Sequence, residues 1–342
     1  MLTLTKKARA TPVVEIHNKR TRSKKPEEVV YYTHDSKAAG NVAPAAGVLA
    51  LHKSMLKKVH KLSNADFQKI CVMIDTQAEP DSGEPLRSEY WELHKVYERA
   101  LRNEMYLGDQ DDLYFEHNFP RDKKTWGGNF LMVGNSGAGK TYFVVEMLLR
   151  YLRATKPHAR RTIIYISPEA EIDKTLKKLK DRRFAYNVLF IDVSEQALQE
   201  SGMDALSFYK THVGDVVEKH SENSIQIYDD FMDAAPGLEV MLRKLYVRGL
   251  RTARHKNASV ISLVHSYSSG KNTSQALQSV KFIVMFSRSS KSRIVMFLRD
   301  HLQIPVKEGK ELVERFAKLS RYMIIRMHSP VCIYCEKYLM LL

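Results

Sequence analysis

The stretch that decides the fold is GNSGAGKT, Gly134 to Thr141, which directly follows the apolar run from Asn129 to Val133. Glycine loses more backbone entropy on folding than other residues. Three glycines among eight residues therefore indicate a backbone bend that residues with larger side chains could not adopt. The spacing matches GxxxxGK followed by Ser or Thr, and an amphipathic pattern from Lys140 to Leu152 predicts a helix immediately behind it. A buried strand, a glycine-rich bend and a helix in this order predict a phosphate-binding loop.

The loop predicts a nucleoside triphosphate and Mg²⁺ as cofactors, with ATP as the expected nucleotide. Backbone N–H groups would turn inward around the phosphates, and the start of the helix adds unpaired donors and the positive end of its dipole. Lys140 is expected to reach the β and γ phosphates, and Thr141 to give a hydroxyl ligand to Mg²⁺. The expected nucleotide contacts are Gly134, Asn135, Ser136, Gly137, Ala138, Gly139, Lys140, Thr141 and Tyr142.

An acidic pair ends a second apolar run, SIQIYDDF, from Ser224 to Phe231. We expect Asp229 to hold the magnesium ion through water and Asp230 to polarise the attacking water, so that Asp230 is the catalytic carboxylate. Adjacent carboxylates repel each other, and a nearby cation would offset this repulsion and explain why the two acids lie together. The alternative is a strand end that carries two solvated acids.

From Trp126 onward, short β-rich runs alternate with helical stretches, which predicts an α/β fold: a P-loop NTPase core with a central, mostly parallel sheet flanked by helices. The expected strands are Asn129–Val133, Thr162–Ser167, Asn187–Val193, Ile225–Asp229, Ser259–His265 and Lys281–Phe286, and the expected helices are Lys140–Leu152, Ile172–Leu179 and Gly237–His255. Two strands intervene in sequence between the loop and the acidic pair, which leaves room for extra strands and favours the P-loop class with an additional central strand. The run Ser259–His265 would insert between the two.

Histidine and arginine residues near this run are further candidates for the site. His265 at the strand end could sense the γ-phosphate or position water, and a histidine merely satisfied at a strand end is the alternative. Arg243, Arg248, Arg251 and Arg254 spread over more than one face of a helix. Arg251 and Arg254 lie nearest the next strand and are the better candidates for an arginine that reaches a neighbouring subunit's nucleotide, the alternative being a solvated basic helix.

The remainder of the chain predicts three parts. Residues 1–27 are basic and poor in core residues and predict a flexible arm, which could bind phosphates, act as a nuclear-localisation patch or be a solvated tail. Residues 28–120 predict a small, mainly helical region, with helical periodicity at Val48–Leu62, Asp66–Asp75 and Ser88–Arg102. Residues 121–342 form the expected ATPase domain, closed by a hairpin of Tyr322–Met327 and Val331–Tyr338.

The segments GNSGAGKT, IQIYDD and RTARHKNASVISLVHSYS together resemble the FtsK-HerA superfamily of DNA-translocating ATPases, and within it the packaging ATPases of poxviruses, giant viruses, virophages and polinton-like elements. The resemblance covers roughly residues 129–330. It implies a RecA-like core, ATP hydrolysis and an oligomeric ring, commonly a hexamer, that pumps double-stranded DNA into a capsid. The sequence departs from the family at His265, where Gln is usual, and at Asp230, where many members have Glu.

The expected function is therefore an ATP-hydrolysing DNA translocase that packages a viral or virus-like genome, with double-stranded DNA, further copies of the chain and a capsid or portal protein as partners. A net charge of +15 agrees with a polyanionic partner. The alternatives are a helicase or conjugation-type pump of the same superfamily, or a nucleotide-gated virion assembly protein with little turnover. No apolar run reaches the ~18 residues of a membrane span.

Three cysteines give no disulfide framework and fit a reducing compartment, so the expected location is intracellular, in the host nucleus or a cytoplasmic virus factory, or in the virion. Cys332 and Cys335 form a CxxC pair without enough neighbours for a zinc site, which favours apolar packing. Trp126 could stack on adenine or serve the core. Arg288, Lys291 and Arg293 could contact DNA or nucleotide, or belong to a solvated loop.

Overall fold

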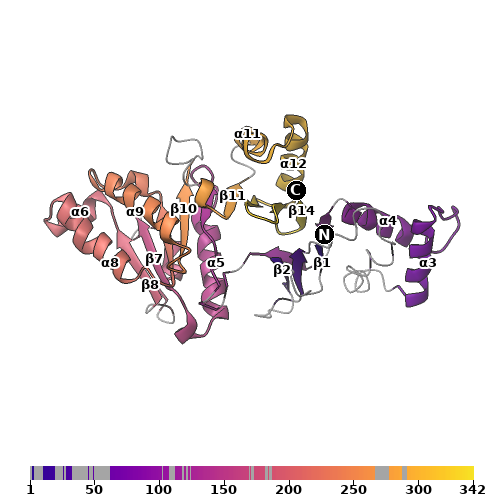
Figure 1. Ribbon diagram of the computed structural model, residues 1–342, viewed down its shortest axis with the longest axis horizontal. Coiled ribbons are helices and arrows are strands. Elements are labelled where there is room, and N and C mark those ends of the chain that lie inside the picture. The colour runs from indigo at the N-terminus through magenta and orange to yellow at the C-terminus, as the bar shows by residue number, and fades with distance from the viewer. Residues whose placement is uncertain are drawn as a thin grey trace. The chain divides into compact units, whose positions relative to one another are not determined.

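The computed structural model describes residues 2–3, 11–19, 26, 28–32, 45, 49, 62–101, 103–107, 112–117, 119–120, 122–123, 125–168, 170, 173–181, 184, 187–265, 277–286 and 291–342. The chain divides into two compact units, one of Met1–Glu116 with Pro330–Leu342 and one of His117–Ser329 (Figure 1). Most of the expected helix Val48–Leu62, the basic run after Lys19 and Arg288 lie outside the described residues.

Among its described residues, the first unit contains a four-stranded antiparallel sheet in the order β1-β3-β2-β5, two helices and a second group of short antiparallel strands. Its elements are β1 (Leu2–Thr3), β2 (Thr11–Asn18), β3 (Glu28–Tyr32), α3 (Asn64–Asp75), α4 (Arg87–Leu101), β4 (Glu104–Tyr106), β5 (Leu113–Glu116), β13 (Cys332–Tyr334) and β14 (Tyr338–Leu341). The helices α3 and α4 pack around a shared apolar cluster that includes Phe67, Ile70 and Leu93, and both agree with the expected helices to within two residues.

The structure differs from the sequence expectation at both ends of this unit. The expected flexible arm contains β2, in which Val13, Val14 and Ile16 are buried, so this segment has a core to join. The expected hairpin arm Val331–Tyr338 is not one strand, because β13 ends at Tyr334 and β14 turns back to pair with it. These C-terminal strands group with the first unit, since β14 also pairs with β4.

The second unit is an α/β domain with a large, mostly parallel sheet flanked by helices. Its strands lie in the order β12-β11-β6-β10-β9-β7-β8, and only β12 runs antiparallel, against β11. The strands are β6 (Phe130–Val133), β7 (Thr162–Ser167), β8 (Val188–Asp192), β9 (Ser224–Asp229), β10 (Ser259–Val264), β11 (Phe282–Phe286) and β12 (Tyr322–Arg326). Each expected strand of the sheet is present within two residues of its predicted bounds.

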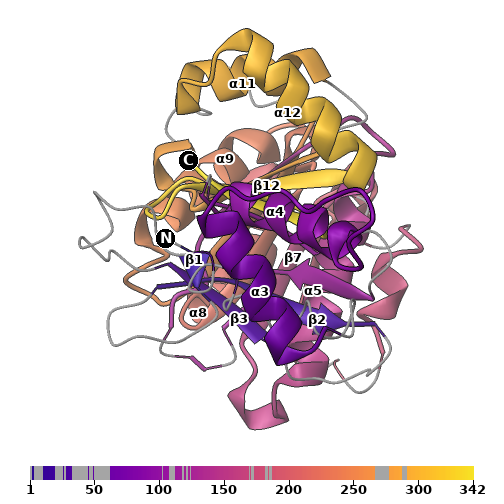
Figure 2. The same ribbon diagram turned by 90° about the vertical axis from the view of Figure 1, so that its right-hand side faces the viewer.

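Helices cover both faces of this sheet. The helical elements are α5 (Lys140–Ala154), η2 (Pro157–Ala159), η3 (Leu176–Lys178), α6 (Glu195–Ser201), α7 (Ala205–Phe208), the π-helical turn η5 (Tyr209–Gly214), α8 (Asp215–Lys219), η6 (Phe231–Asp233), α9 (Leu238–Thr252), α11 (Lys291–Leu302) and α12 (Val306–Leu319). Figure 1 shows α5 on one side of the central strands and α8 and α9 on the other, and Figure 2 shows α11 and α12 side by side.

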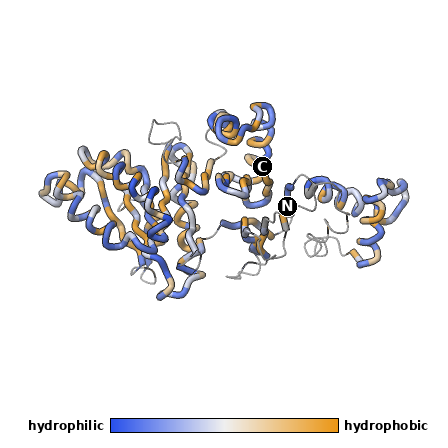
Figure 3. The backbone as a smooth tube through the Cα atoms, viewed as in Figure 1, coloured by the Kyte–Doolittle hydropathy of each residue, from blue (hydrophilic) through white to orange (hydrophobic). Residues whose placement is uncertain are grey.

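The core of the second unit consists of strands that are buried along their length. In β6, β9 and β11 every residue is buried, which is the pattern of parallel strands covered on both faces. Figure 3 shows these strands as mostly hydrophobic, with hydrophilic residues on the outer turns of the helices. The sheet is therefore a rigid support for the loops at its edges.

Candidate functional site

The loops after three neighbouring strands meet at the carboxyl edge of the sheet. β10 lies between β6 and β9, as the sequence predicts, with Val264 paired to Val133 and Leu263 paired to Asp229. Both pairings are parallel, so all three strands end at the same edge, where ligands bind in open α/β sheets. β7 and β8, which intervene in sequence, lie beyond β9 instead.

The glycine-rich loop joins β6 to α5 with a backbone that requires glycine. Gly137 and Gly139 have φ angles of 72° and 101°, in the left-handed region that a side chain disfavours. A Cβ atom on Gly134 would lie 3.1 Å from the Ala138 Cβ and 3.1 Å from a ring carbon of Phe286. The loop is thus a tight bend whose N–H groups precede a helix with no side-chain cap, and its first N–H groups have no intrahelical partner.

Lys140 lies inside this loop. Its side chain is buried, and Nζ donates hydrogen bonds to the carbonyl oxygens of Gly134 at 2.9 Å and Asn135 at 3.4 Å. Among the described residues, no carboxylate forms an ion pair with it. A buried cation held only by carbonyl groups suits an anionic ligand, since burying an unpaired charge is costly.

Thr141 and Asp229 connect the loop to the acidic strand end. Thr141 Oγ1 donates to Asp229 Oδ2 at 3.2 Å, and the buried Tyr165 hydroxyl on β7 donates to the same oxygen at 2.6 Å. The other carboxylate oxygen, Oδ1, is buried and has no partner among the described residues. The two residues expected at the magnesium ion therefore lie side by side, with one carboxylate oxygen unsatisfied.

Burial controls the ionisation of Asp229. It raises the pKa of this carboxyl to about 6, with a smaller upward contribution from Asp230, while hydrogen bonds from Tyr165 and Thr141 and the charge of Lys140 act in the opposite direction. A buried carboxylate with a free oxygen beside a threonine hydroxyl fits a hard divalent cation that takes its other ligands from phosphate and water. The described residues contain no group of three or more His, Cys, Asp or Glu side chains suited to a metal, so an all-protein metal cage is not the kind of site observed there.

Asp230 follows directly and has an unusual backbone. Its φ of 43° is left-handed for a non-glycine residue, a conformation that concentrates at functional sites. Its side chain is one-third exposed, and Oδ1 lies 3.4 Å from Nε2 of His265, which follows β10. The structure thus brings His265 to the acid that we expect to polarise water.

Arg251 and Arg254 do not join this site within one chain. The helix α9 connects two parallel strands and so runs back to the opposite edge of the sheet. The turn that follows α9 confirms this direction. The Lys256 carbonyl accepts a hydrogen bond from the Asn223 N–H, just before β9, and the Asn257 carbonyl accepts one from the buried Arg161 guanidinium, just before β7. Arg251 and Arg254, both exposed, therefore lie at the amino edge.

Two residues of the site were not identified from the sequence, and two residues that were expected to contact nucleotide make other contacts. Tyr165 and Phe286 contact the site from β7 and β11; a tyrosine within the apolar run TIIYIS was the available signal for the first. The ring of Tyr142 is exposed, and Lys178 Nζ lies 5.0 Å from its centre. Trp126 is half-buried and donates to the Ala258 carbonyl at the amino edge of the sheet.

Outside the site, Cys332 and Cys335 are buried in the first unit, and burial raises the pKa of the Cys335 thiol to about 11. Lys291 and Arg293 begin α11 and are exposed. In the part of the chain that the structure describes, no helix is both long enough and apolar enough to span a bilayer.

No protein-family model matches this chain, and neither does any curated protein sequence. Solved structures with a similar fold include the genome packaging NTPase B204 of Sulfolobus turreted icosahedral virus 2 in complex with ATP-gammaS, at 14% identity over 64% of this chain and 98% of that one, with a TM-score of 0.36. The pCW3 conjugation coupling protein TcpA matches at 11% identity over 69% and 66%, with a TM-score of 0.38. The cytoplasmic domain of the Type VII secretion ATPase EccC of Thermomonospora curvata matches at 11% over 69% and 29%, with a TM-score of 0.39. Identities and TM-scores this low support no conclusion about function. The function proposed below therefore rests on the geometry of the chain itself.

Proposed function

We propose that this protein hydrolyses ATP at the carboxyl edge of the sheet and uses the turnover to move double-stranded DNA, packaging a viral or virus-like genome. The observation that carries the proposal is the contact between Thr141 and Asp229, which joins the glycine-rich loop to the acidic strand end beside a buried Lys140. The basic excess of +15 supports a DNA partner. The resemblance of the loop, acid and Arg-His segments to packaging ATPases supports the packaging role.

The residues divide the chemistry between them. The loop N–H groups and Lys140 bind the β and γ phosphates, and Thr141 and Asp229 hold Mg²⁺, which neutralises charge on the phosphates when bound. Asp230 accepts a hydrogen bond from the attacking water and takes up its proton, and His265 orients the Asp230 carboxylate from β10. Tyr165 fixes Asp229 so that Oδ1 stays available.

Assembly completes the proposal. The chain forms a homo-oligomeric ring, with six copies as in the family it resembles, and docks on a capsid or portal protein. Arg251 and Arg254 lie at the edge of the sheet far from the chain's own loop, so an arginine from this helix meets a nucleotide only across a subunit boundary.

Steady-state ATP hydrolysis with and without linear duplex DNA tests the function. We expect duplex to stimulate turnover, and Lys140→Ala to reduce it at least about 100-fold, because it removes the cation at the transferred phosphate. Lys307→Ala, an exposed lysine on α12, is the matched control and should behave as wild type. Absence of turnover in the wild type, or a Lys140→Ala variant that is unaffected, contradicts the proposal.

Three further assays separate the related functions. A packaging pump displaces a triplex-forming strand from duplex without unwinding it, whereas a helicase separates a forked duplex. Nucleotide binding without single-turnover hydrolysis would instead identify a nucleotide-gated assembly protein.

A further inference from the structure

The helix α9 presents a row of cations on its outer side. Lys244, Arg248 and Arg251 are exposed and follow one another at i, i+4 and i+7, the spacing that places side chains on one helix face. Arg254 is exposed and Lys256 half-buried in the turn that follows. We name these five residues the α9 cationic face.

The face itself contains no acidic residue, and the acidic residue of α9 is Glu239 in its first turn. The sequence from Val240 to Arg299 contains no Asp or Glu. The apolar side of α9, with Leu238, Leu242, Leu245, Tyr246 and Leu250, is buried against the domain, so little apolar surface is left to enter a bilayer. Such a face suits a polyanion in water better than a membrane surface.

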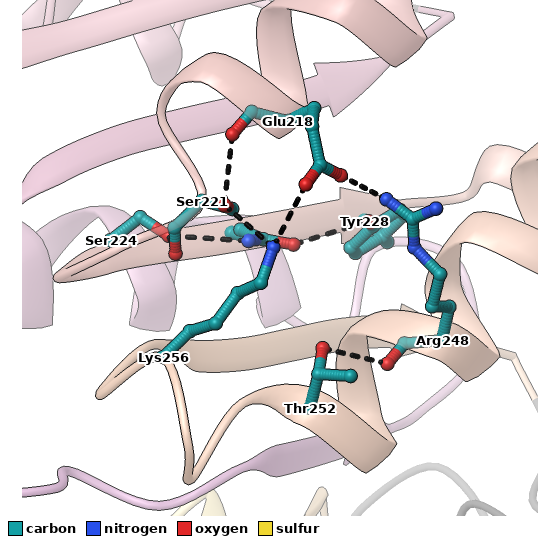
Figure 4. A network of polar contacts seen from close by, with 8 residues as sticks. Glu218, Ser221, Ser224, Tyr228, Arg248, Thr252 and Lys256 are labelled. Atoms are coloured by element: carbon teal, nitrogen blue, oxygen red, sulfur yellow. Dashed lines mark hydrogen bonds and ion pairs between the residues drawn. The ribbon is translucent and has the colours of Figure 1, made fainter.

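Among the described residues, one carboxylate, on α8, forms ion pairs with this face. Glu218 forms ion pairs with Arg248 and, at 3.2 Å, with Lys256, whose Nζ also donates to Ser221 Oγ at 2.8 Å (Figure 4). These cations lower the pKa of Glu218, so it is ionised at neutral pH. Glu218 and Arg248 are each more than half exposed, and such pairs contribute little to stability. The single negative charge of Glu218 therefore neutralises only part of the positive charge of Arg248 and Lys256. Lys244, Arg251 and Arg254 form no ion pair among the described residues.

We propose that the α9 cationic face binds backbone phosphates of double-stranded DNA, and that Glu218 is an internal counter-ion that limits the affinity by competing for Arg248 and Lys256. From Lys244 to Arg251 the helix rises about 10 Å, which matches about three phosphates of one DNA strand. The inference rests on the DNA partner of the proposed function. It gives Arg251 and Arg254 a role at DNA.

Binding of a fluorescent 30-base-pair duplex to the full chain, measured by anisotropy without nucleotide from 50 to 200 mM salt, tests the inference. Each phosphate contact contributes about 0.9 to the slope of log affinity against log salt. Glu218→Gln should tighten binding about 3- to 10-fold at 100 mM salt and steepen the slope by about 1 to 2. Arg251→Glu should weaken binding about 10-fold and reduce the slope by about 1.

Matched variants with the same change of net charge lie on α12. Glu314→Gln and Lys307→Glu, both exposed, should change affinity less than 2-fold. The gain from Glu218→Gln is informative because a misfolded variant would not bind more tightly. Equal effects of Glu218→Gln and Glu314→Gln, no loss with Arg251→Glu, or effects seen with anionic phosphatidylserine vesicles and not with duplex would each overturn the inference.

Nucleotide experiments keep this inference separate from the proposed function. If the wild type neither binds nor hydrolyses ATP but the α9 variants behave as expected, the proposed ATPase fails and the DNA face stands. If ATP is hydrolysed and the α9 variants bind DNA as wild type, the face fails and the ATPase stands.

Discussion

Replacing Tyr165 with Phe tests how the fold holds the acidic end of β9. The change removes one buried hydroxyl that donates to Asp229 at 2.6 Å and leaves the ring in place. A hydrogen bond to an ionised group contributes about 1.5–3 kcal/mol, whereas one to a neutral group contributes about 1 kcal/mol. The cost of Tyr165→Phe should therefore depend on the charge of Asp229.

The pH dependence follows from the raised pKa of Asp229, which is about 6 against 3.8 for an ordinary aspartate side chain. The folded state holds its proton more tightly than the unfolded chain, so the domain loses about 3 kcal/mol from this group as the pH rises from about 4 through 6. At pH 7.5 Asp229 is ionised and depends on Tyr165; at pH 5 it is mostly protonated. We expect Tyr165→Phe to cost about 2 kcal/mol at pH 7.5 and about 1 kcal/mol or less at pH 5.

Urea unfolding at the two pH values, without nucleotide, measures this difference. A Trp91→Phe background leaves Trp126, in the same unit as Tyr165, as the only tryptophan. Tyr246→Phe is the matched control, because its buried hydroxyl meets the neutral Ser262 Oγ at 2.9 Å, and its cost should be the same at both pH values. A Tyr165→Phe cost that is equal at both pH values, or absent at pH 7.5, refutes the reasoning.

Two further predictions concern backbone space and a buried charge. Gly134→Ala should weaken binding of a fluorescent ATP analogue about 10-fold, because its Cβ meets Ala138 and Phe286 at 3.1 Å and shifts the loop; titration of both proteins checks this, and unchanged affinity would argue against a tight loop. Burial, with the charge of Arg326, lowers the pKa of Lys281 to about 8, so its charge destabilises the fold below pH 8 and this cost disappears as the pH rises toward 10.5. Lys281→Met should then stabilise the domain by about 1–2 kcal/mol at pH 7, less than the full shift implies because the ammonium also lies 5.8 Å from the centre of the Trp126 ring; denaturation at pH 7 and 10 should show the gain only at pH 7.

The sequence predicts much of the second unit because its signals are local. The apolar runs at β6, β7, β9, β10 and β11 are long enough to identify strands, and the glycine spacing identifies the loop between β6 and α5. The position of β10 between its neighbours also follows from the class of fold that the spacing favours.

Other features depend on contacts between distant segments. Tyr165 reaches Asp229 across the sheet, and β14 pairs with β4 although the two are far apart in the chain. The alternation of Val14 and Ile16 was a usable signal for β2 that the surrounding basic residues outweighed. The direction of α9 could have been predicted from the connection rule for parallel strands, which places Arg251 and Arg254 away from the loop.

The central claim is that the glycine-rich loop and the acidic pair form one hydrolytic site, and single-turnover hydrolysis by Asp230→Asn tests it most directly. Asparagine accepts the left-handed backbone at this position and removes only the charge. The account predicts that Asp230→Asn binds ATP and Mg²⁺ as the wild type does, but hydrolyses the bound nucleotide about 10²- to 10⁴-fold more slowly. Hydrolysis of bound ATP at the wild-type rate would contradict it.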